Sequence, residues 1–269
     1  MRVTHPGFWL GPLGGLVALP DSAGSVSSSR EATAQYRPLL DGGLVAYVEH
    51  VRPMRTWNIT IPRVDPEEIS GFRELLEHDP LGAWWFVHPH ARATNVLTPG
   101  MCDKPELVQA GARPVEGGDR VVRSWMAGGA SVTWGPVPVV QGIPVTGSAF
   151  LSSAEQVTVG LRWLDLAGAT LSTTTASQAV PSGTLRRVAV TGKPPAGAVS
   201  VVLVAAHAAV VARPAVTWTK GPTEWGPGAG ASAVHVAGWS SDLVKAVFDP
   251  GVDLRMEDVS FSVQEVRDA

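Results

Sequence analysis

Residues 81–100 read Leu-Gly-Ala-Trp-Trp-Phe-Val-His-Pro-His-Ala-Arg-Ala-Thr-Asn-Val-Leu-Thr-Pro-Gly and decide the fold of the first part of the chain. Large aromatic and β-branched residues favour a pleated backbone, so Trp84, Trp85, Phe86 and Val87 predict a strand. This strand is apolar on both faces, which means that it is either fully buried or pressed against another subunit. We predict that Trp84, Trp85 and Phe86 form a subunit interface.

The segment before this stretch predicts a strand and then a helix. Trp57 and Ile59 alternate with polar residues, the pattern of a half-buried strand, which Pro62 would end. A helix over residues 66–77 would be capped by Asp65, with Pro66 at its first position and Glu68 completing a capping box. Its apolar face would pack on the N-terminal sheet through Ile69, Phe72, Leu75 and Leu76.

Composition favours many short strands. Of the 269 residues, 45% are apolar and 17% charged, while 29 Gly and 22 Pro supply turns and disfavour long helices. The net charge of -3 gives no basic surface, so nucleic acid is excluded as a partner. The longest apolar run, residues 199–212, is shorter than the ~20 residues that span a bilayer and is better explained as two core strands. Gly and Pro interrupt the apolar N-terminus, so we expect neither a cleaved signal nor membrane insertion.

The middle of the chain predicts a β-sandwich or jelly roll. Eight candidate strands follow at roughly 8–12-residue spacing: residues 121–126, 131–134, 147–152, 156–165, 170–175, 185–190, 199–206 and 209–219. The clearest alternation places Val157, Val159, Leu161 and Trp163 on one face. Elsewhere, residues 44–51, 232–237 and 259–266 predict strands, residues 243–248 are ambiguous between strand and helix, and the serine-rich residues 21–31 predict a loop.

The order of strand, helix, aromatic strand and the hinge Asn95-Val-Leu-Thr-Pro99 resembles that of minor tail proteins of siphophages that infect actinobacteria. The resemblance implies a mainly β chain: a β-sandwich domain with one α-helix, then a galactose-binding-like jelly roll similar to carbohydrate-binding modules. It implies a tail-assembly domain over residues 1–94, the jelly roll over residues 95–219, and closing strands over residues 220–269 that return to the N-terminal domain. Similarity to distal tail proteins further implies a homo-oligomeric ring, a hexamer.

Several kinds of reactive site were considered, and none is complete. The sequence contains no nucleophile elbow, phosphate loop, dinucleotide fingerprint or zinc-protease motif. His88 and His90 could share one face of a strand, but a zinc site needs another ligand, and exposed loop histidines are the better interpretation. The acidic residues from Asp249 to Asp258 lack the spacing of a calcium loop and are better read as a solvated turn. The single cysteine, Cys102, is expected to be a small buried hydrophobe.

Glycoside hydrolysis needs two facing carboxyl groups. In the jelly-roll region the choices have no apolar setting in the sequence that would raise a pKa: Asp103, Glu106, Glu116, Asp119, Glu155 and Asp165. We therefore expect no catalytic activity, no cofactor and no metal.

Tryptophan side chains are the candidate sugar-stacking groups, because aromatic faces pack on the C–H surfaces of sugar rings. The candidates are Trp125, Trp134, Trp163 and Trp218, and the alternative for each is burial in the core. Trp163 shares the apolar face of its strand, so the core is the better assignment for it. Trp134 precedes Gly135-Pro136 at a strand end and is predicted to be an exposed platform, with Trp125 as a second carbohydrate-binding residue.

The leading hypothesis is a structural minor tail protein at the tail tip of a long-tailed phage. It would contribute to assembly with other phage tail proteins, and its jelly roll could attach to a host cell-surface glycan. It would reside in the virion after synthesis in the host cytoplasm. The alternative is a freestanding carbohydrate-binding accessory protein without catalytic activity, and a weaker rival is a hydrolase with an unrecognised site.

Overall fold

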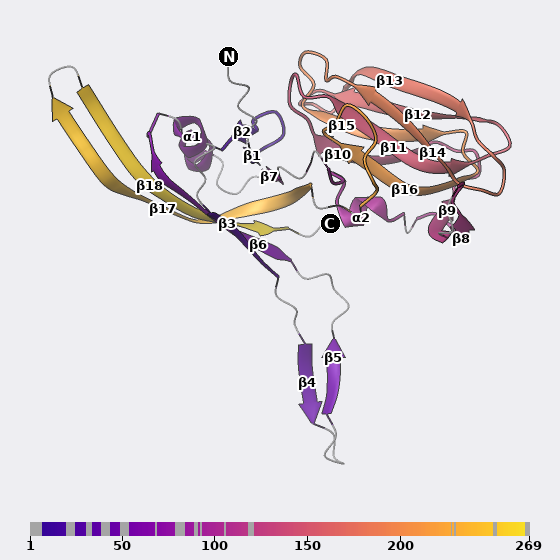
Figure 1. The fold of residues 1–269 in the computed structure, drawn as a ribbon, viewed down its shortest axis with the longest axis horizontal. Helices are drawn as coiled ribbons and strands as arrows, with labels where there is room; N and C mark the ends of the chain where they lie inside the picture. The colour runs from indigo at the N-terminus through magenta and orange to yellow at the C-terminus, as the bar shows by residue number, and fades with distance from the viewer. Residues whose placement is uncertain are drawn as a thin grey trace.

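The computed structural model describes residues 7–19, 25–30, 34–38, 44–48, 54–67, 69–78, 84–88, 91, 93–104, 106–117, 121–226, 228, 230–249 and 252–266 (Figure 1). The fold is mainly β, as expected, with strands from the two ends of the chain forming one sheet and the middle forming a sandwich. In this described part, no helix is both long enough and apolar enough to span a bilayer.

The first sheet joins segments that are far apart in the sequence. Its strand order is β2 (Val17–Ala18), β1 (Trp9–Gly11), β7 (Trp84–Val87), β17 (Ala231–Asp249), β18 (Val252–Glu265), β6 (Arg55–Val64) and β3 (Ser25–Arg30). Every pairing in it is antiparallel, including β7 with β17 and β6 with β18. The C-terminal strands therefore return to the N-terminal ones.

Strand β6 shows how alternation produces a one-sided core. Trp57, Ile59 and Ile61 are at most 2% exposed, whereas the residues between them face outward. Pro62 does not end the strand, contrary to expectation: β6 continues to Val64 through a bulge, where the pairing with β18 shifts register. Proline lacks an N–H and fits at a bulge, and Arg63 there adopts a φ of 51° while its backbone N–H donates to Asp258.

Helix α1 (Ser70–His78) begins later than expected. The Asp65 carboxylate accepts from the backbone N–H of Glu67 at 2.9 Å, so it stabilises a turn ahead of the helix. Packing on the N-terminal sheet is as predicted: Ile69 and Phe72 are each 1% exposed, and the Phe72 ring contacts Trp84 at 5.8 Å between ring centroids. The other two residues of the expected face, Leu75 and Leu76, have side chains outside the described residues.

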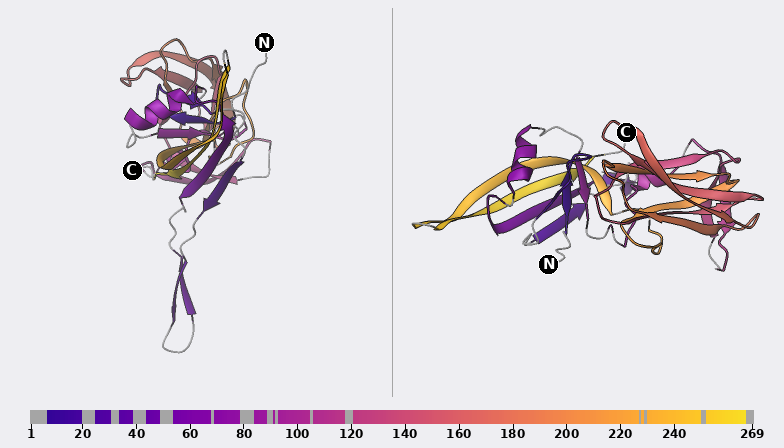
Figure 2. Two further views of the ribbon diagram at one scale, coloured as in Figure 1. Left: turned by 90° about the vertical axis from the view of Figure 1, so that its left-hand side faces the viewer. Right: turned by 90° about the horizontal axis from the view of Figure 1, so that it is seen from above.

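Two hairpins extend from the first sheet (Figures 1 and 2). Strand β17 pairs with β18 from Val234 to Asp249, whereas it pairs with β7 only over its first four residues, Ala231 to Val234. The hairpin therefore continues beyond the rest of the sheet. Strands β4 (Ala34–Pro38) and β5 (Leu44–Val48) form a separate two-stranded sheet that projects away from the body.

The middle of the chain forms the predicted jelly-roll sandwich of two antiparallel sheets. The four-stranded sheet has the order β10 (Val132–Pro138), β15 (Ser200–Ala206), β12 (Gln156–Leu164) and β13 (Thr170–Ala179). The five-stranded sheet has the order β14 (Arg186–Gly192), β11 (Val145–Ser152), β16 (Val210–Thr217), β9 (Val121–Met126) and β8 (Gln109–Pro114). Four side chains of β12 fill the core at 0–1% exposure: Val157, Val159, Leu161 and Trp163.

Some strand assignments add to or differ from the sequence prediction. The serine-rich segment expected to be a loop contains β3, which pairs with β6 residue by residue. Strand β8 was missed, because its sequence Gln-Ala-Gly-Ala-Arg-Pro has few large apolar residues. The ambiguous residues 243–248 belong to strand β17. In β3 and β17, pairing with a neighbour in the sheet supplied what local sequence did not indicate.

Strand β7 lies between the two cores, which corrects the prediction of a subunit interface. Trp84 and Phe86 are 1% exposed and belong to the core of the first sheet, whereas Trp85 and Val87, at 8% and 0%, belong to the hydrophobic cluster of the sandwich. Neighbouring residues of a strand point to opposite faces. The aromatic residues are therefore buried on both faces by this chain and present no surface to another subunit.

Candidate functional site

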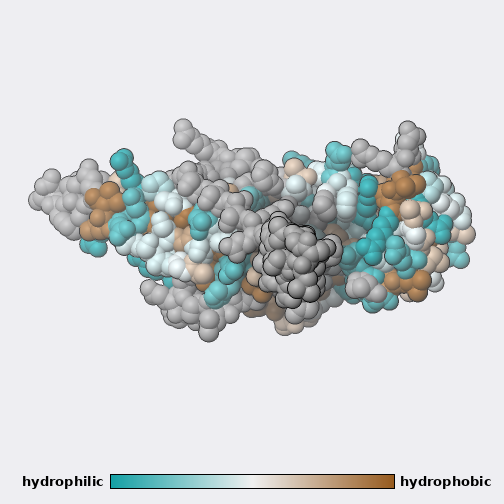
Figure 3. Space-filling view, turned by 90° about the horizontal axis from the view of Figure 1, so that it is seen from below, coloured by the Kyte–Doolittle hydropathy of each residue, from teal (hydrophilic) through white to brown (hydrophobic). Residues whose placement is uncertain are grey.

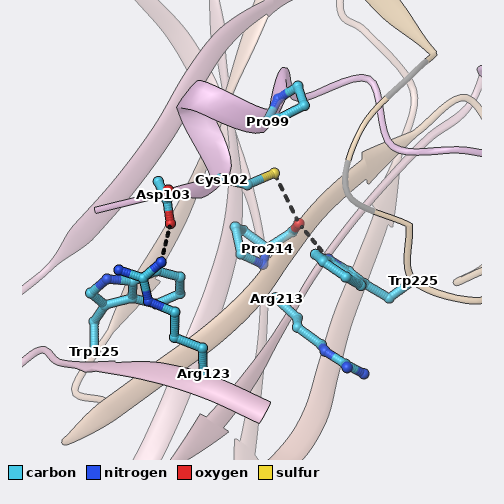
Figure 4. Close-up of a pocket in the computed structure, with 8 residues that line it drawn as sticks. All are labelled: Pro99, Cys102, Asp103, Arg123, Trp125, Arg213, Pro214 and Trp225. Atoms are coloured by element: carbon cyan, nitrogen blue, oxygen red, sulfur yellow. Dashed lines mark hydrogen bonds and ion pairs between the residues drawn. The ribbon is translucent and has the colours of Figure 1, made fainter. Parts of the chain in front are cut away.

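A pocket of about 350 Å³ opens at the edge of the sandwich where several segments of the chain meet (Figure 4). Its walls come from the short helix α2 (Pro99–Cys102), strand β9, a bulge in strand β16 and the segment that follows the sandwich. Eight residues line it: Pro99, Cys102, Asp103, Arg123, Trp125, Arg213, Pro214 and Trp225.

Local hydrogen bonds explain why α2 forms at this place. Thr98 precedes the helix with an extended backbone, and its hydroxyl oxygen accepts from the backbone N–H of Met101 at 3.2 Å. Pro99 follows at the first helical position, where its missing N–H costs nothing. This part of the Asn-Val-Leu-Thr-Pro hinge therefore encodes a one-turn helix, a second helix that the sequence analysis did not predict.

Asn95 joins this hinge to the sandwich. It is 1% exposed, and its Oδ1 accepts from the backbone N–H groups of Leu97 at 3.1 Å and Val216 at 2.8 Å. Its Nδ2 donates to the carbonyl oxygen of Pro214 at 2.8 Å and contacts the Cys102 sulfur at 3.3 Å. One amide side chain thus fixes α2 against strand β16.

The bulge in β16 presents a carbonyl group to the back of the pocket. Register shifts between the pairs at Ser148 and Phe150 of β11, and Arg213 adopts a φ of 46° in the opposing strand. The carbonyl oxygen of Pro214 accepts from Asn95 and, at 3.0 Å, from the indole N–H of Trp225. The bulge therefore holds Trp225 at the pocket through the carbonyl oxygen of Pro214 (Figure 4).

Two arginine–tryptophan pairs flank the pocket. The guanidinium carbon of Arg123 lies 5.5 Å from the centroid of Trp125, and that of Arg213 lies 4.9 Å from the centroid of Trp225. Asp103 contributes a carboxylate 3.6 Å from Arg123. The site combines indole surface with hydrogen-bond donors and one acidic acceptor, which is suited to a polyhydroxylated ligand.

Cys102 is not an activated nucleophile. Burial raises the pKa of its thiol to about 12, against a lowering contribution from Asn95. The thiol is therefore protonated at neutral pH, and the thiolate is the reactive form. The expectation of a buried hydrophobic residue is confirmed.

The two tryptophans that the sequence analysis selected lie in different places. Trp125 lines the pocket, although only 7% of its surface is exposed. Trp134 is 2% exposed, so its predicted role as an open platform is wrong. Its side chain faces inward from β10 with Val132, because residues two apart in a strand share a face, and both belong to the core cluster of the sandwich. Trp163 and Trp218 are core residues, at 1% and 5% exposure.

Three residues of the pocket were missed: Arg123, Arg213 and Trp225. Trp225 falls in a Gly/Pro-rich segment, a composition typical of a linker. The bulge that aims Arg213 leaves no mark in the local sequence. A tryptophan within a linker-like segment is the one signal that could have indicated the site, because a large aromatic residue there needs a surface to pack on.

The side chains that the sequence analysis considered as metal ligands make other contacts. The His88 ring packs edge-on against Phe8 at 5.0 Å and against Phe86 at 5.5 Å between centroids, whereas His90 lies outside the described residues. In the acidic string, Glu257 lies in strand β18 and not in the expected turn. Its carboxylate pairs with Arg73 of helix α1 at 2.5 Å. Among the residues that the structure describes, no group of three or more His, Cys, Asp or Glu is placed to hold a metal ion.

Comparisons with known proteins give only distant similarities. No protein-family model and no curated protein sequence matches the chain. The solved structures that are similar include the enzymatically active domain of tailspike protein 4 of bacteriophage CBA120, at 9% identity and a TM-score of 0.28 over 74% of this chain and 21% of that chain. The CBM22-1–GH10 modules of Clostridium thermocellum endo-1,4-β-D-xylanase 10B, complexed with xylohexaose, match at 15% identity and a TM-score of 0.32 over 50% of this chain and 30% of that chain.

The VP2 subviral particle of infectious bursal disease virus is similar at 8% identity and a TM-score of 0.24, over 96% of this chain and 71% of that chain. The chain thus spans about a fifth of the tailspike chain and less than a third of the xylanase chain. Similarities this distant establish neither a common fold nor a common function.

Proposed function

We propose that this chain is a structural protein of a long-tailed phage, built into the tail tip, whose jelly roll binds a sugar of the host cell surface without catalytic turnover. The observation that carries the sugar-binding part is the pocket between Trp125 and Trp225, with Arg123, Arg213 and Asp103 at its rim. The sequence resemblance to siphophage minor tail proteins supports the phage assignment.

The dimensions and chemistry of the pocket favour a small part of a glycan. A volume of about 350 Å³ lies near the lower end of ligand sites and accommodates one or two sugar rings. The indole of Trp225 is half-buried and offers apolar surface to the C–H face of a ring. Guanidinium groups donate to sugar hydroxyls, and the carboxylate of Asp103 accepts from them.

Assembly would rest on the projecting hairpins, in place of the buried aromatic strand. Leu243 and Val244 are 62% and 48% exposed on β17, in the part that extends beyond β7. Seen from below, apolar patches lie at that end of the molecule and on the sandwich, between hydrophilic residues (Figure 3). In the described part of the chain, the outer edge of β17 beyond Val234 has no strand partner, so its backbone groups are free to pair with another subunit.

Several copies would make weak sugar binding effective. A shallow pocket of this kind binds one sugar at about millimolar affinity, or ~4 kcal/mol. A ring of subunits, a hexamer by the sequence resemblance, could raise the effective affinity by about 10²–10⁴ on a surface that repeats the same sugar. The alternative, a freestanding carbohydrate-binding protein, would bind the same sugar as a monomer.

The test of sugar binding uses the full chain on an array of cell-wall and capsular oligosaccharides. Trp225→Leu removes the flat ring from the pocket, and Trp239→Leu makes the same change at a half-buried tryptophan of the first sheet. We expect Trp225→Leu to lose binding and Trp239→Leu to keep it. If both variants bind as well as the wild type, the pocket is not the sugar-binding site.

The test of assembly is sedimentation of the purified chain, together with antibody labelling of phage particles in the electron microscope. A tail-tip protein should sediment as an oligomer and label one end of the tail. Leu243→Asp should shift the protein towards the monomer, whereas Leu171→Asp, at a 44% exposed leucine of the sandwich, should not. A wild-type monomer that labels no particle would favour the freestanding alternative.

A further inference from the structure

A second group of residues lies on the outer face of the five-stranded sheet, centred on Arg187 of β14. The adjacent Val188 is 1% exposed and faces the core, so the arginine side chain faces outward. Its Nε and Nη2 donate to the Ser148 hydroxyl at 3.2 and 3.0 Å, and its Nη1 donates to the carbonyl oxygen of Thr223. The guanidinium carbon also lies 5.8 Å from the centroid of the Phe150 ring.

These contacts hold the guanidinium in one orientation without neutralising it. Arg55, Arg73 and Arg186 each pair with a glutamate, whereas no acidic side chain of the described residues forms an ion pair with Arg187. Burial lowers the pKa of Arg187. A half-buried cation that lacks a counter-charge is costly, which is the arrangement expected where a ligand supplies the charge.

The geometry also leaves donors for such a ligand. A guanidinium has five N–H groups, and three of them are used by Ser148 and Thr223. One N–H remains on each of Nη1 and Nη2, and these donors are available to the oxygens of a carboxylate or phosphate. The hydroxyl of Thr223 is a further polar group: its oxygen is buried and has no hydrogen-bond partner among the described residues.

We propose that Arg187, with Ser148 and Thr223, forms a subsite for an oxyanion carried on a sugar, either the carboxylate of a uronic acid or a phosphate ester. This site goes beyond the sugar pocket at Trp225 and does not depend on it. Phe150 is half-buried and packs against an apolar cluster that includes Val122, so a sugar ring beside the anion would meet apolar surface as well as charge. Because Ser148 and Phe150 already hold the arginine, little side-chain freedom would be lost on binding.

Binding can be measured with three probes: inorganic phosphate, D-glucuronate and D-glucose. In an NMR titration of the full chain, we expect the Arg187 Nε–Hε signal to shift with at least one of the anions and not with glucose. Arg187→Gln should weaken anion binding about 10-fold or more, because hydrogen bonds to a charged group are lost. Arg187→Lys, which keeps the charge without the fork, should bind with intermediate affinity.

Arg186→Gln is the matched control, since Arg186 is the preceding residue but is paired with Glu116. It should bind the anions as the wild type does. A response to phosphate alone identifies a phosphate ester, one to glucuronate alone a uronic acid, and one to both a general oxyanion site. The proposal is overturned if neither anion binds, if Arg187→Gln binds normally, or if Arg186→Gln loses as much affinity. The sugar array with Trp225→Leu and the anion titration with Arg187→Gln use different probes and different variants, so failure of the sugar pocket and failure of this subsite are distinguishable.

Discussion

Replacing Asn95 with alanine should destabilise the sandwich more than its small size suggests. The side chain is 1% exposed and accepts hydrogen bonds from the backbone N–H groups of Leu97 and Val216. In the alanine variant, the carbonyl oxygen of Pro214 would still accept the hydrogen bond from the Trp225 indole, which is 3.0 Å long. The backbone N–H groups of Leu97 and Val216 would have no acceptor. An unsatisfied buried donor costs about 1–3 kcal/mol, so the expected loss in unfolding free energy is about 4 kcal/mol.

The assay is urea unfolding followed by tryptophan fluorescence and by far-ultraviolet circular dichroism, with stability taken from the transition that both signals share. Asn58→Ala is the matched control, because Asn58 lies on the exposed face of β6 and its replacement should change stability by no more than about 0.5 kcal/mol. A loss below about 1 kcal/mol for Asn95→Ala would refute the reasoning, since it would mean that the two N–H groups find other partners.

Three further predictions concern the core, the junction and the thiol. Phe72→Ala should lower the unfolding free energy of the first sheet by about 3–5 kcal/mol, measured by denaturant unfolding. The ring is 1% exposed and contacts three aromatic residues, so its removal leaves a cavity. A loss under about 1 kcal/mol would contradict this packing. Gly230→Ala should cost about 1–3 kcal/mol, because the added Cβ would lie 3.0 Å from the backbone of Ala91 and Thr94, whereas Gly226→Ala, with open space around it, should have little effect. Burial raises the pKa of Cys102 from 9.0 to about 12, so the contribution of this thiol to stability should be constant below pH 9 and be lost between pH 9 and 12. Cys102→Ala should reduce the loss of stability over that range in pH-dependent melting, and an unchanged profile would disprove the assignment.

The junction between the first sheet and the sandwich shows how composition can mislead. Proline and glycine near residues 94–100 and 220–230 suggest exposed linkers. In the structure, Asn95 and Leu97 are 0–1% exposed, and the backbone N–H of Gly230 donates to the carbonyl oxygen of Asn95 at 2.9 Å. Gly230 is required because the two crossing segments touch there, not because the chain must flex. We therefore expect limited proteolysis to spare this junction.

Local pattern was sufficient for the strands in which apolar and polar residues alternate regularly. Side chains two residues apart in a strand share a face. On that basis the sequence pattern placed Val157 and Trp163 of β12, and Trp57 and Ile59 of β6, in the core correctly. The helix start was wrong because the carboxylate of Asp65 can stabilise a turn as well as a helix, and its own sequence does not distinguish the two. The serine-rich strand β3 was missed because pairing with β6, and not its own composition, makes it a strand.

By itself the sequence determined the mainly β class, the positions of most sandwich strands and the aromatic strand β7, because side-chain alternation and turn residues act over a few neighbours. Tertiary structure decided where each tryptophan faces. Trp134 and Trp125 both lie on strands, but only the stacking of the sheets puts the first inside and the second at a pocket wall. That pocket joins residues 99–103, 123–125, 213–214 and 225, which are brought together by the bulge in β16 and the Asn95 hydrogen bonds. Contacts between residues more than a hundred positions apart depend on how sheets pair and pack, and no short stretch of sequence specifies them.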